Sequence, residues 1–170
     1  MSEFQRKSII NNLLRLGPVL ILFISVLNEI DLNYIKFFSF NFTFILVFYW
    51  SVRRTESLGY GYIFLAGLIN DVVTGFPIGI SSFNYLLICG FAAYLRTITL
   101  SPNLVKDWFF FLFTILVVNS ASYSILNIFF SIDLNYYNLF VNIFFTFIFY
   151  IIFANLFLMY QNKFFKESND

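Results

Sequence analysis

The sequence predicts an all-α integral membrane protein with six transmembrane helices. Hydrophobic residues make up 60% of the 170 positions and charged residues only 11%, against roughly 25% charged residues in an average soluble domain. A water-soluble fold of this length does not bury so much apolar surface. The apolar residues also fall into six runs, and a helix needs about 20 residues to cross a ~30 Å hydrocarbon core. We therefore assign residues 1–170 to a single polytopic membrane domain.

Short polar turns separate the six predicted spans. No small-residue cleavage site follows the first apolar run, so we expect this helix to stay on the protein. The second span ends in Phe48-Tyr49-Trp50, an aromatic cluster of the kind found at membrane interfaces. The third and fourth are joined by Gly75-Phe76-Pro77-Ile78-Gly79, in which two glycines and a proline favour a tight turn. The spans cover about residues 13–30, 35–51, 58–74, 80–95, 107–130 and 137–160.

The positions of the basic residues predict the orientation of the chain. If the N-terminus is cytoplasmic, nine of the ten Lys and Arg residues fall on the inner side, and only Lys36 lies outside. This asymmetry indicates a bacterial cytoplasmic membrane protein with both termini in the cytoplasm and the Gly75–Gly79 turn facing outward. The nine inner residues are Arg6, Lys7, Arg15, Arg53, Arg54, Arg96, Lys106, Lys163 and Lys166.

The composition also argues against several classes of function. A net charge of +1 leaves no electrostatic surface for nucleic acid. With no histidine and a single cysteine, Cys89, the chain lacks the ligands for a Cys/His metal site, and we expect no metal and no cofactor. No span holds two acids and no serine lies in a nucleophile motif. The sequence therefore predicts a protein that is not an enzyme.

The third span carries the candidate site. Gly67, Asp71 and Gly75 are spaced i, i+4, i+8, which places two small residues and a carboxylate on one helix face. Small residues at this spacing allow another helix to approach closely. An acid within a membrane helix costs about 2.5–3.5 kcal/mol and faces protein or water by default. Asp71 therefore either binds a ligand, a proton or a partner's basic group, or caps the adjacent turn as a structural acid.

Other polar residues favour structural roles. Ser120, Ser124 and Asn127 form a stripe on the fifth span, and such stripes more often join helices than bind substrates. Arg53-Arg54 lies in a charged loop and acts as a topology determinant, or else contacts anionic lipid head groups or a cytoplasmic partner. Further residues of the same polar kind are Asn119, Ser122, Asn142, Thr146 and Asn155.

Several short motifs point to a known family. The motifs are Phe48-Tyr49-Trp50, then Gly67-Leu68-Ile69-Asn70-Asp71, then Gly75-x-Pro77-x-Gly79, and finally Ala93-Tyr94-Leu95 at the end of the fourth span. Together they resemble the bacterial rod shape-determining protein MreD family. Size, six-span layout and cytoplasmic termini are similar along the whole chain, whereas the motifs cover about residues 48–96.

The resemblance implies a non-enzymatic scaffold subunit of the cell-wall elongation complex. It implies as partners the bitopic protein MreC, the transglycosylase RodA, a penicillin-binding protein and the actin-like MreB, in addition to membrane lipid. The family is also similar in fold to the substrate-binding subunits of energy-coupling-factor vitamin transporters. Vitamin binding is therefore the alternative function, although the short outer loops offer few polar residues to enclose a vitamin.

Overall fold

The computed structural model describes residues 16–27, 40–53, 58–99, 103–131 and 136–165, and every regular element in these ranges is a helix. A first helix covers Leu16–Leu27. It is followed by α2 (Phe42–Arg53), α3 (Tyr60–Thr74), α4 (Ile80–Ile98), α5 (Leu104–Phe130) and α6 (Tyr136–Phe165). The predicted all-α class is thus confirmed for the described part of the chain.

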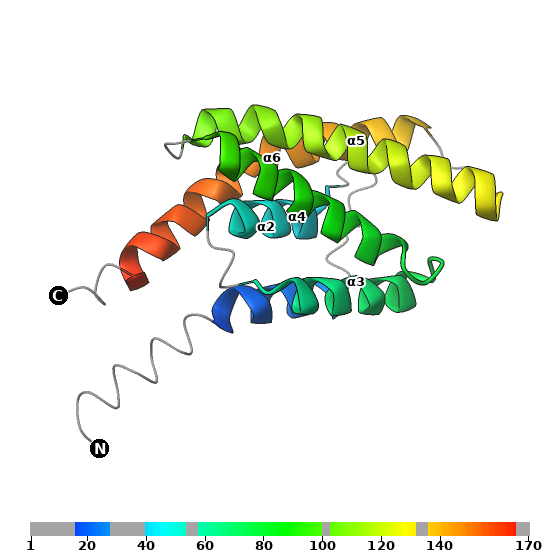
Figure 1. The fold of residues 1–170 in the computed structure, drawn as a ribbon, viewed down its shortest axis with the longest axis horizontal. Coiled ribbons are helices and arrows are strands. Elements are labelled where there is room, and N and C mark those ends of the chain that lie inside the picture. The colour runs from blue at the N-terminus through cyan, green and yellow to red at the C-terminus, as the bar shows by residue number, and fades with distance from the viewer. Residues whose placement is uncertain (1–15, 28–39, 54–57, 100–102, 132–135, 166–170) are drawn as a thin grey trace, which may run out of the picture.

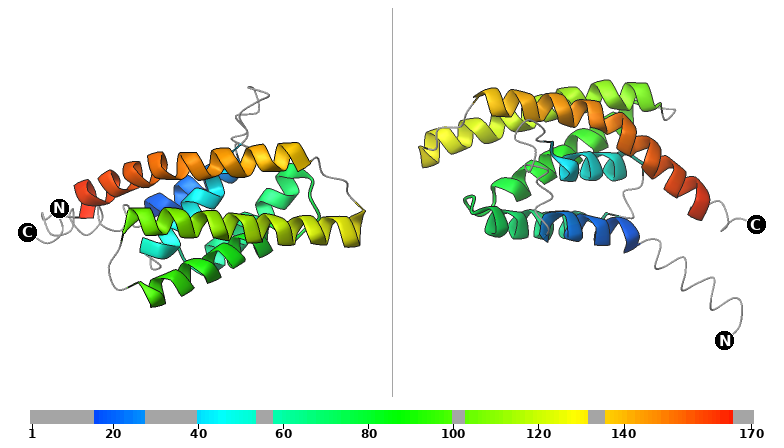
Figure 2. Two further views of the ribbon diagram at one scale, coloured as in Figure 1. Left: turned by 90° about the horizontal axis from the view of Figure 1, so that it is seen from above. Right: turned by 180° about the vertical axis from the view of Figure 1, so that it is seen from behind.

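The helices are stacked in layers. The long helices α5 and α6 lie side by side along one face of the bundle, and α3 and the Leu16–Leu27 helix lie on the opposite face (Figures 1 and 2). Between these layers α2 lies in the middle, while α4 slants across the bundle. Helix α4 accordingly packs against α3, α2 and α5, and α6 packs against α5 and α2.

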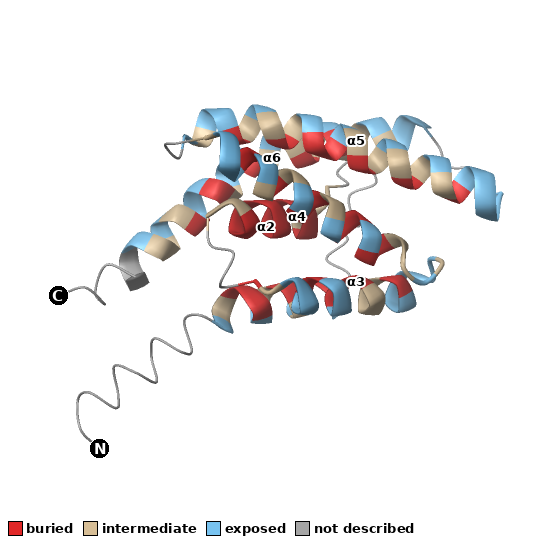
Figure 3. Ribbon diagram, viewed as in Figure 1, coloured by how far each residue is buried: buried red, intermediate tan, exposed pale blue. Residues whose placement is uncertain are grey.

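Helix α2 is the centre of the core. Its residues from Thr43 to Ser51 are all buried, and Figure 3 shows this helix buried along almost its whole length. Phe48 contacts the rings of Phe111 on α5 and Tyr150 on α6, with centroid distances of 5.0 and 5.8 Å. Aromatic pairs at such separations add to the stabilisation from burial alone.

The cluster Phe48-Tyr49-Trp50 was expected at a membrane interface, but its side chains are surrounded by protein instead of facing lipid head groups. All three side chains are fully enclosed by protein. The reason is the position of α2, because helices such as α4 and α6 pack against it and its residues from Thr43 to Ser51 are buried. The motif provides core packing rather than an aromatic belt.

Several helix ends differ from the predicted boundaries. Phe40 and Asn41 are not helical, so α2 begins at Phe42, well after the predicted start at residue 35. Asn41 accounts for this start, because its Oδ1 accepts a hydrogen bond from the backbone N–H of Phe44 at 3.1 Å and so caps the first turn. The N–H of Asn41 in turn donates to Thr146 Oγ1 on α6 at 2.9 Å.

Three other helices extend beyond their predicted bounds, whereas α3 starts at Tyr60, two residues after the predicted start. Helix α4 continues to Ile98 and α6 reaches Phe165. Helix α5 starts at Leu104, because the side chain of Asn103 accepts a hydrogen bond from Val105 N–H at 2.9 Å and so caps its first turn. The predicted first span, 13–30, extends past the described residues at both ends, and the start of the second, 35–39, also lies outside them.

Length and apolar composition single out two helices that suffice to cross a membrane, Leu104–Phe130 and Tyr136–Asn162. Three shorter apolar helices are also present, namely Leu16–Leu27, Phe42–Arg53 and Tyr60–Thr74. At 1.5 Å per residue the 12 residues of α2 extend only about 18 Å. The six-span arrangement therefore stays a prediction, in which two of the described helices meet the requirements of length and apolar composition together.

The polar stripe predicted on α5 faces outward. Ser120, Ser124 and Asn127 are exposed, and the Ser124 hydroxyl donates to the backbone of its own helix, at Ser120 O. The neighbouring Ser122 instead points inward and donates to Asn84 Oδ1 on α4. The hydrogen bond that joins α5 to α4 is therefore made by Ser122, on a different face of α5 from the stripe.

Candidate functional site

The turn between α3 and α4 is built on Asp71. Helix α3 ends at Thr74, and the two glycines that flank the turn have positive φ angles, 72° at Gly75 and 104° at Gly79. Such angles are strained for residues with a side chain, so the pattern of two glycines around a proline has the backbone role expected for it. The carboxylate of Asp71, which is fully buried, lies against this turn.

Both carboxylate oxygens of Asp71 accept hydrogen bonds from the start of α4. Oδ2 accepts from the N–H of Gly79 at 2.7 Å, and Oδ1 accepts from the N–H of Ser81 at 2.9 Å. The first N–H groups of a helix have no partners within it and carry a partial positive charge. Asp71 therefore satisfies two of these donors and places its negative charge where the helix dipole favours it.

These contacts correspond to the second of the two roles predicted for Asp71, that of a structural acid which caps the adjacent turn. Among the described residues the only charge pair found joins Arg53 to Asp107, and it does not involve Asp71. That the Gly67/Asp71/Gly75 face also binds a ligand or a partner stays a prediction, because these contacts do not test it.

At Gly67 the backbones of α3 and α4 are in close contact. A Cβ atom added to Gly67 would lie 2.4 Å from the Cα atom and 2.5 Å from the backbone N of Ser82. Since Ser82 belongs to α4, the close approach expected for the small residues is made within the chain. The Ser82 hydroxyl also donates to Phe64 O at 3.0 Å. Gly75, by contrast, has nothing within 4 Å of its Cβ position and serves only the turn.

A second polar site lies at the C-terminal end of α2. Arg53, the last residue of α2, forms an ion pair with Asp107 in the first turn of α5, with 2.8 Å between Arg53 Nη2 and Asp107 Oδ2. The side chains are 14% and 2% exposed, so this pair is largely removed from solvent. A cation at a helix C-terminus and an anion at a helix N-terminus each suit the local dipole.

The sequence-based interpretation missed this ion pair. Arg53 was assigned to a loop, whereas it ends a helix, and Asp107 was treated as the edge of a span; Arg54 lies outside the described residues. A usable signal was present, because the two residues have opposite charges and lie at span ends predicted to share one side of the membrane. Their separation of 54 residues hides the pairing from local pattern analysis.

The acidic residues of both sites are used for contacts between helices. Within the described ranges no group of three or more His, Cys, Asp or Glu side chains lies together in a way that would hold a metal. Both oxygens of Asp71 and one of Asp107 are engaged in contacts that join helices of this chain. What these sites do physically is fix α3 to α4 and α2 to α5.

Comparison with known proteins gives one match. A family model described as rod shape-determining protein MreD matches residues 8–167, nearly the whole chain. No curated protein matches the chain, and no solved structure does. The predicted likeness to the substrate-binding subunits of vitamin transporters therefore has no support from solved structures.

We predict that Gly67→Leu destabilises the bundle more than Asp71→Asn. The leucine forces apart two backbones in contact, at a cost at or above the roughly 1–3 kcal/mol typical of overpacking. The asparagine keeps one acceptor oxygen but turns its NH2 donor toward the second N–H, so one charge-assisted hydrogen bond is lost, worth about 1.5–3 kcal/mol. Thermal unfolding of the purified protein in detergent measures both. Gly90→Leu is the matched control, because nothing lies within 4 Å of that Cβ position. The reverse order would show that the charge of Asp71 has a partner.

We predict that Asp107→Leu is more destabilising than the double substitution Arg53→Met with Asp107→Leu. The single variant leaves the guanidinium buried without its anion, and breaking such a pair costs about 3–5 kcal/mol. Arg53 Nε lacks a hydrogen-bond partner among the described residues, and the double variant removes this unpaired donor together with the charge. The double variant removes both charges and recovers most of the loss. Equal melting temperatures for the two variants would contradict this account of the pair.

Proposed function

We propose, on the premise that the chain belongs to the rod shape-determining protein MreD family, that it is a non-enzymatic membrane scaffold of the cell-wall elongation machinery. The observation that carries the proposal is the family match over residues 8–167, which assigns the chain to rod shape determination. In this proposal the protein links a MreC-like bitopic protein, a RodA-like transglycosylase with its penicillin-binding protein, and a MreB-like filament.

The distribution of polar groups supports a scaffold over an enzyme. The buried acids Asp71 and Asp107 hold the helices of the chain together. The outward faces of α5 and α6 are mostly apolar and carry large side chains such as Phe113, Phe140 and Phe144, which suits contact with lipid or with other membrane helices. These features agree with a subunit that acts through its surfaces.

We also propose that the protein is a multi-pass protein of the cytoplasmic membrane with both termini inside. The family is one of membrane proteins, and the two long apolar helices agree with membrane embedding. The nine-to-one distribution of Lys and Arg supports the orientation.

The scaffold proposal is tested by deletion and by affinity purification. Cells that lack the protein are expected to become round or wide, and the unmodified gene is expected to restore their shape. The Gly67→Leu variant is expected to restore shape less well than Gly90→Leu at equal membrane levels. Purification in detergent followed by mass spectrometry should recover a MreC-like protein or a penicillin-binding protein. Normal cell shape after clean deletion, or recovery of paired transporter ATPases with a tightly bound vitamin, would contradict the proposal.

The topology is tested separately with reporter fusions. We expect cytoplasmic signals for fusions near Arg54, Pro102 and Lys166, because the basic residues gather there. Fusions near Asp31, Pro77 and Asp133 should report the outer side. An outer signal near Arg54 would rule out the six-span arrangement.

A further inference from the structure

We propose that the end of the bundle that holds the Gly75–Gly79 turn contains a binding site for a small uncharged ligand with amide and hydroxyl groups. Two adjoining cavities lie there, with volumes of about 240 and 190 Å³. They share four lining residues, Asn41, Asn70, Phe76 and Tyr85. Each cavity alone is smaller than the ~300 Å³ at which ligand pockets usually begin, but together they exceed it.

The described part of the lining is polar without being charged. Five helices or helix starts each contribute one carboxamide, and among the described residues that line either cavity there is no Asp, Glu, Lys or Arg. A carboxamide offers both hydrogen-bond donors and an acceptor, so such a set suits amide and hydroxyl groups better than ions. The five residues are Asn41, Asn70, Asn84, Asn119 and Asn142.

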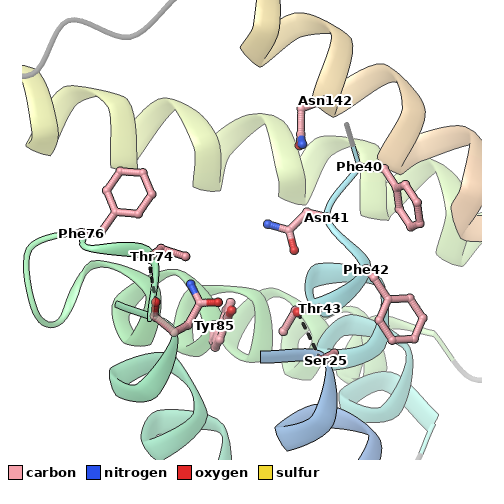
Figure 4. Close-up of a pocket in the computed structure, with 10 residues that line it drawn as sticks. Ser25, Phe40, Asn41, Phe42, Thr43, Thr74, Phe76, Tyr85 and Asn142 are labelled. Atoms are coloured by element: carbon pink, nitrogen blue, oxygen red, sulfur yellow. Dashed lines mark hydrogen bonds between the residues drawn. The ribbon is translucent and has the colours of Figure 1, made fainter. Parts of the chain in front are cut away.

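Figure 4 shows how the larger cavity is arranged. Asn142 reaches in from α6, and Asn41 extends into the same space from the segment before α2. Phe76 of the turn lies on one side, whereas Phe40 and Phe42 lie on the other. The aromatic rings therefore offer apolar faces beside the carboxamides, as in sites that orient a ligand by a few polar groups within an apolar wall.

Helix packing alone does not account for these cavities. Polar residues inside a membrane bundle usually pair across helices, and here Asn84 accepts from Ser122 while Asn70 donates to Ser81 Oγ at 2.9 Å. Around these pairs the described residues leave open space, and the lining includes the exposed residues Thr74 and Phe76, so this space opens at the surface. The two cavities are far larger than the space needed by one water molecule. The same polar residues therefore surround a space that a ligand can occupy.

The inference does not depend on the proposed role in cell shape, and it is tested directly by binding. The probe is N-acetylglucosamine, a neutral sugar that carries an amide and several hydroxyl groups, added to the full-length protein in detergent. Saturation-transfer NMR should detect transfer to the acetamido and ring protons. Glucosamine, which carries an ammonium group in place of the amide, should bind more weakly, because the described residues that line the cavities include no carboxylate to pair with it.

Variants locate the site. Asn142→Leu should weaken binding about threefold to tenfold, the effect of losing one neutral hydrogen bond. Asn155→Leu is the matched control, since Asn155 lies on the same helix, is exposed and lines neither cavity. If Asn142→Leu does not fold, Asn119→Leu on α5 replaces it as the test. Equal transfer to the two sugars, no transfer to either, or equal loss in the control would overturn the proposal.

Discussion

The position of α2 depends on polar contacts at its two ends. At its start, Asn41 caps the first turn and its own N–H is held by Thr146 of α6. At its end, Arg53 is held by Asp107 of α5. Between these points the helix is buried and mostly apolar, and apolar contacts have little directional preference. Thr43, Tyr49 and Ser51 add further hydrogen bonds, to Ser25, Gln161 and Cys89. The hydrogen bonds and the ion pair therefore help to fix where along the bundle this helix lies. The large aromatic side chains around it pack against the helix in that position.

The two buried carboxylates follow one physical rule at opposite ends of the molecule. Asp71 accepts hydrogen bonds from the first N–H groups of α4, and Asp107 lies in the first turn of α5. In both cases the negative charge is close to a helix N-terminus, where unpaired donors and the helix dipole offset the cost of burial. Such a placement lowers the free-energy cost of a buried acid in an apolar bundle. A structural role for both acids agrees with the proposed scaffold, which acts through contacts.

Local patterns predicted much of this fold because their causes are local. Runs of apolar residues predicted the helices, and the glycines at 75 and 79 predicted the turn, since positive φ angles are a property of those residues themselves. The close approach at Gly67 also follows from local spacing. The Arg53–Asp107 pair, the burial of Trp50 and the cavities were not predicted. Hydropathy does not distinguish a side chain facing lipid from one facing protein, and contacts between distant segments leave no local pattern.

The ion pair also has a consequence for how the chain is made. Arg53 leaves the ribosome 54 residues before Asp107, and α2 is synthesised before α4, α5 and α6, the helices that will cover it. Until those helices are made, α2 has a neighbour in the Leu16–Leu27 helix, through Ser25 and Thr43, but no counterion for Arg53. Insertion of the early part of the chain and final folding are thus separated in time, because the counterion comes with α5 and the ring of Tyr150 beside Phe48 comes with α6. A chain that ends before Asp107 therefore holds Arg53 without its partner.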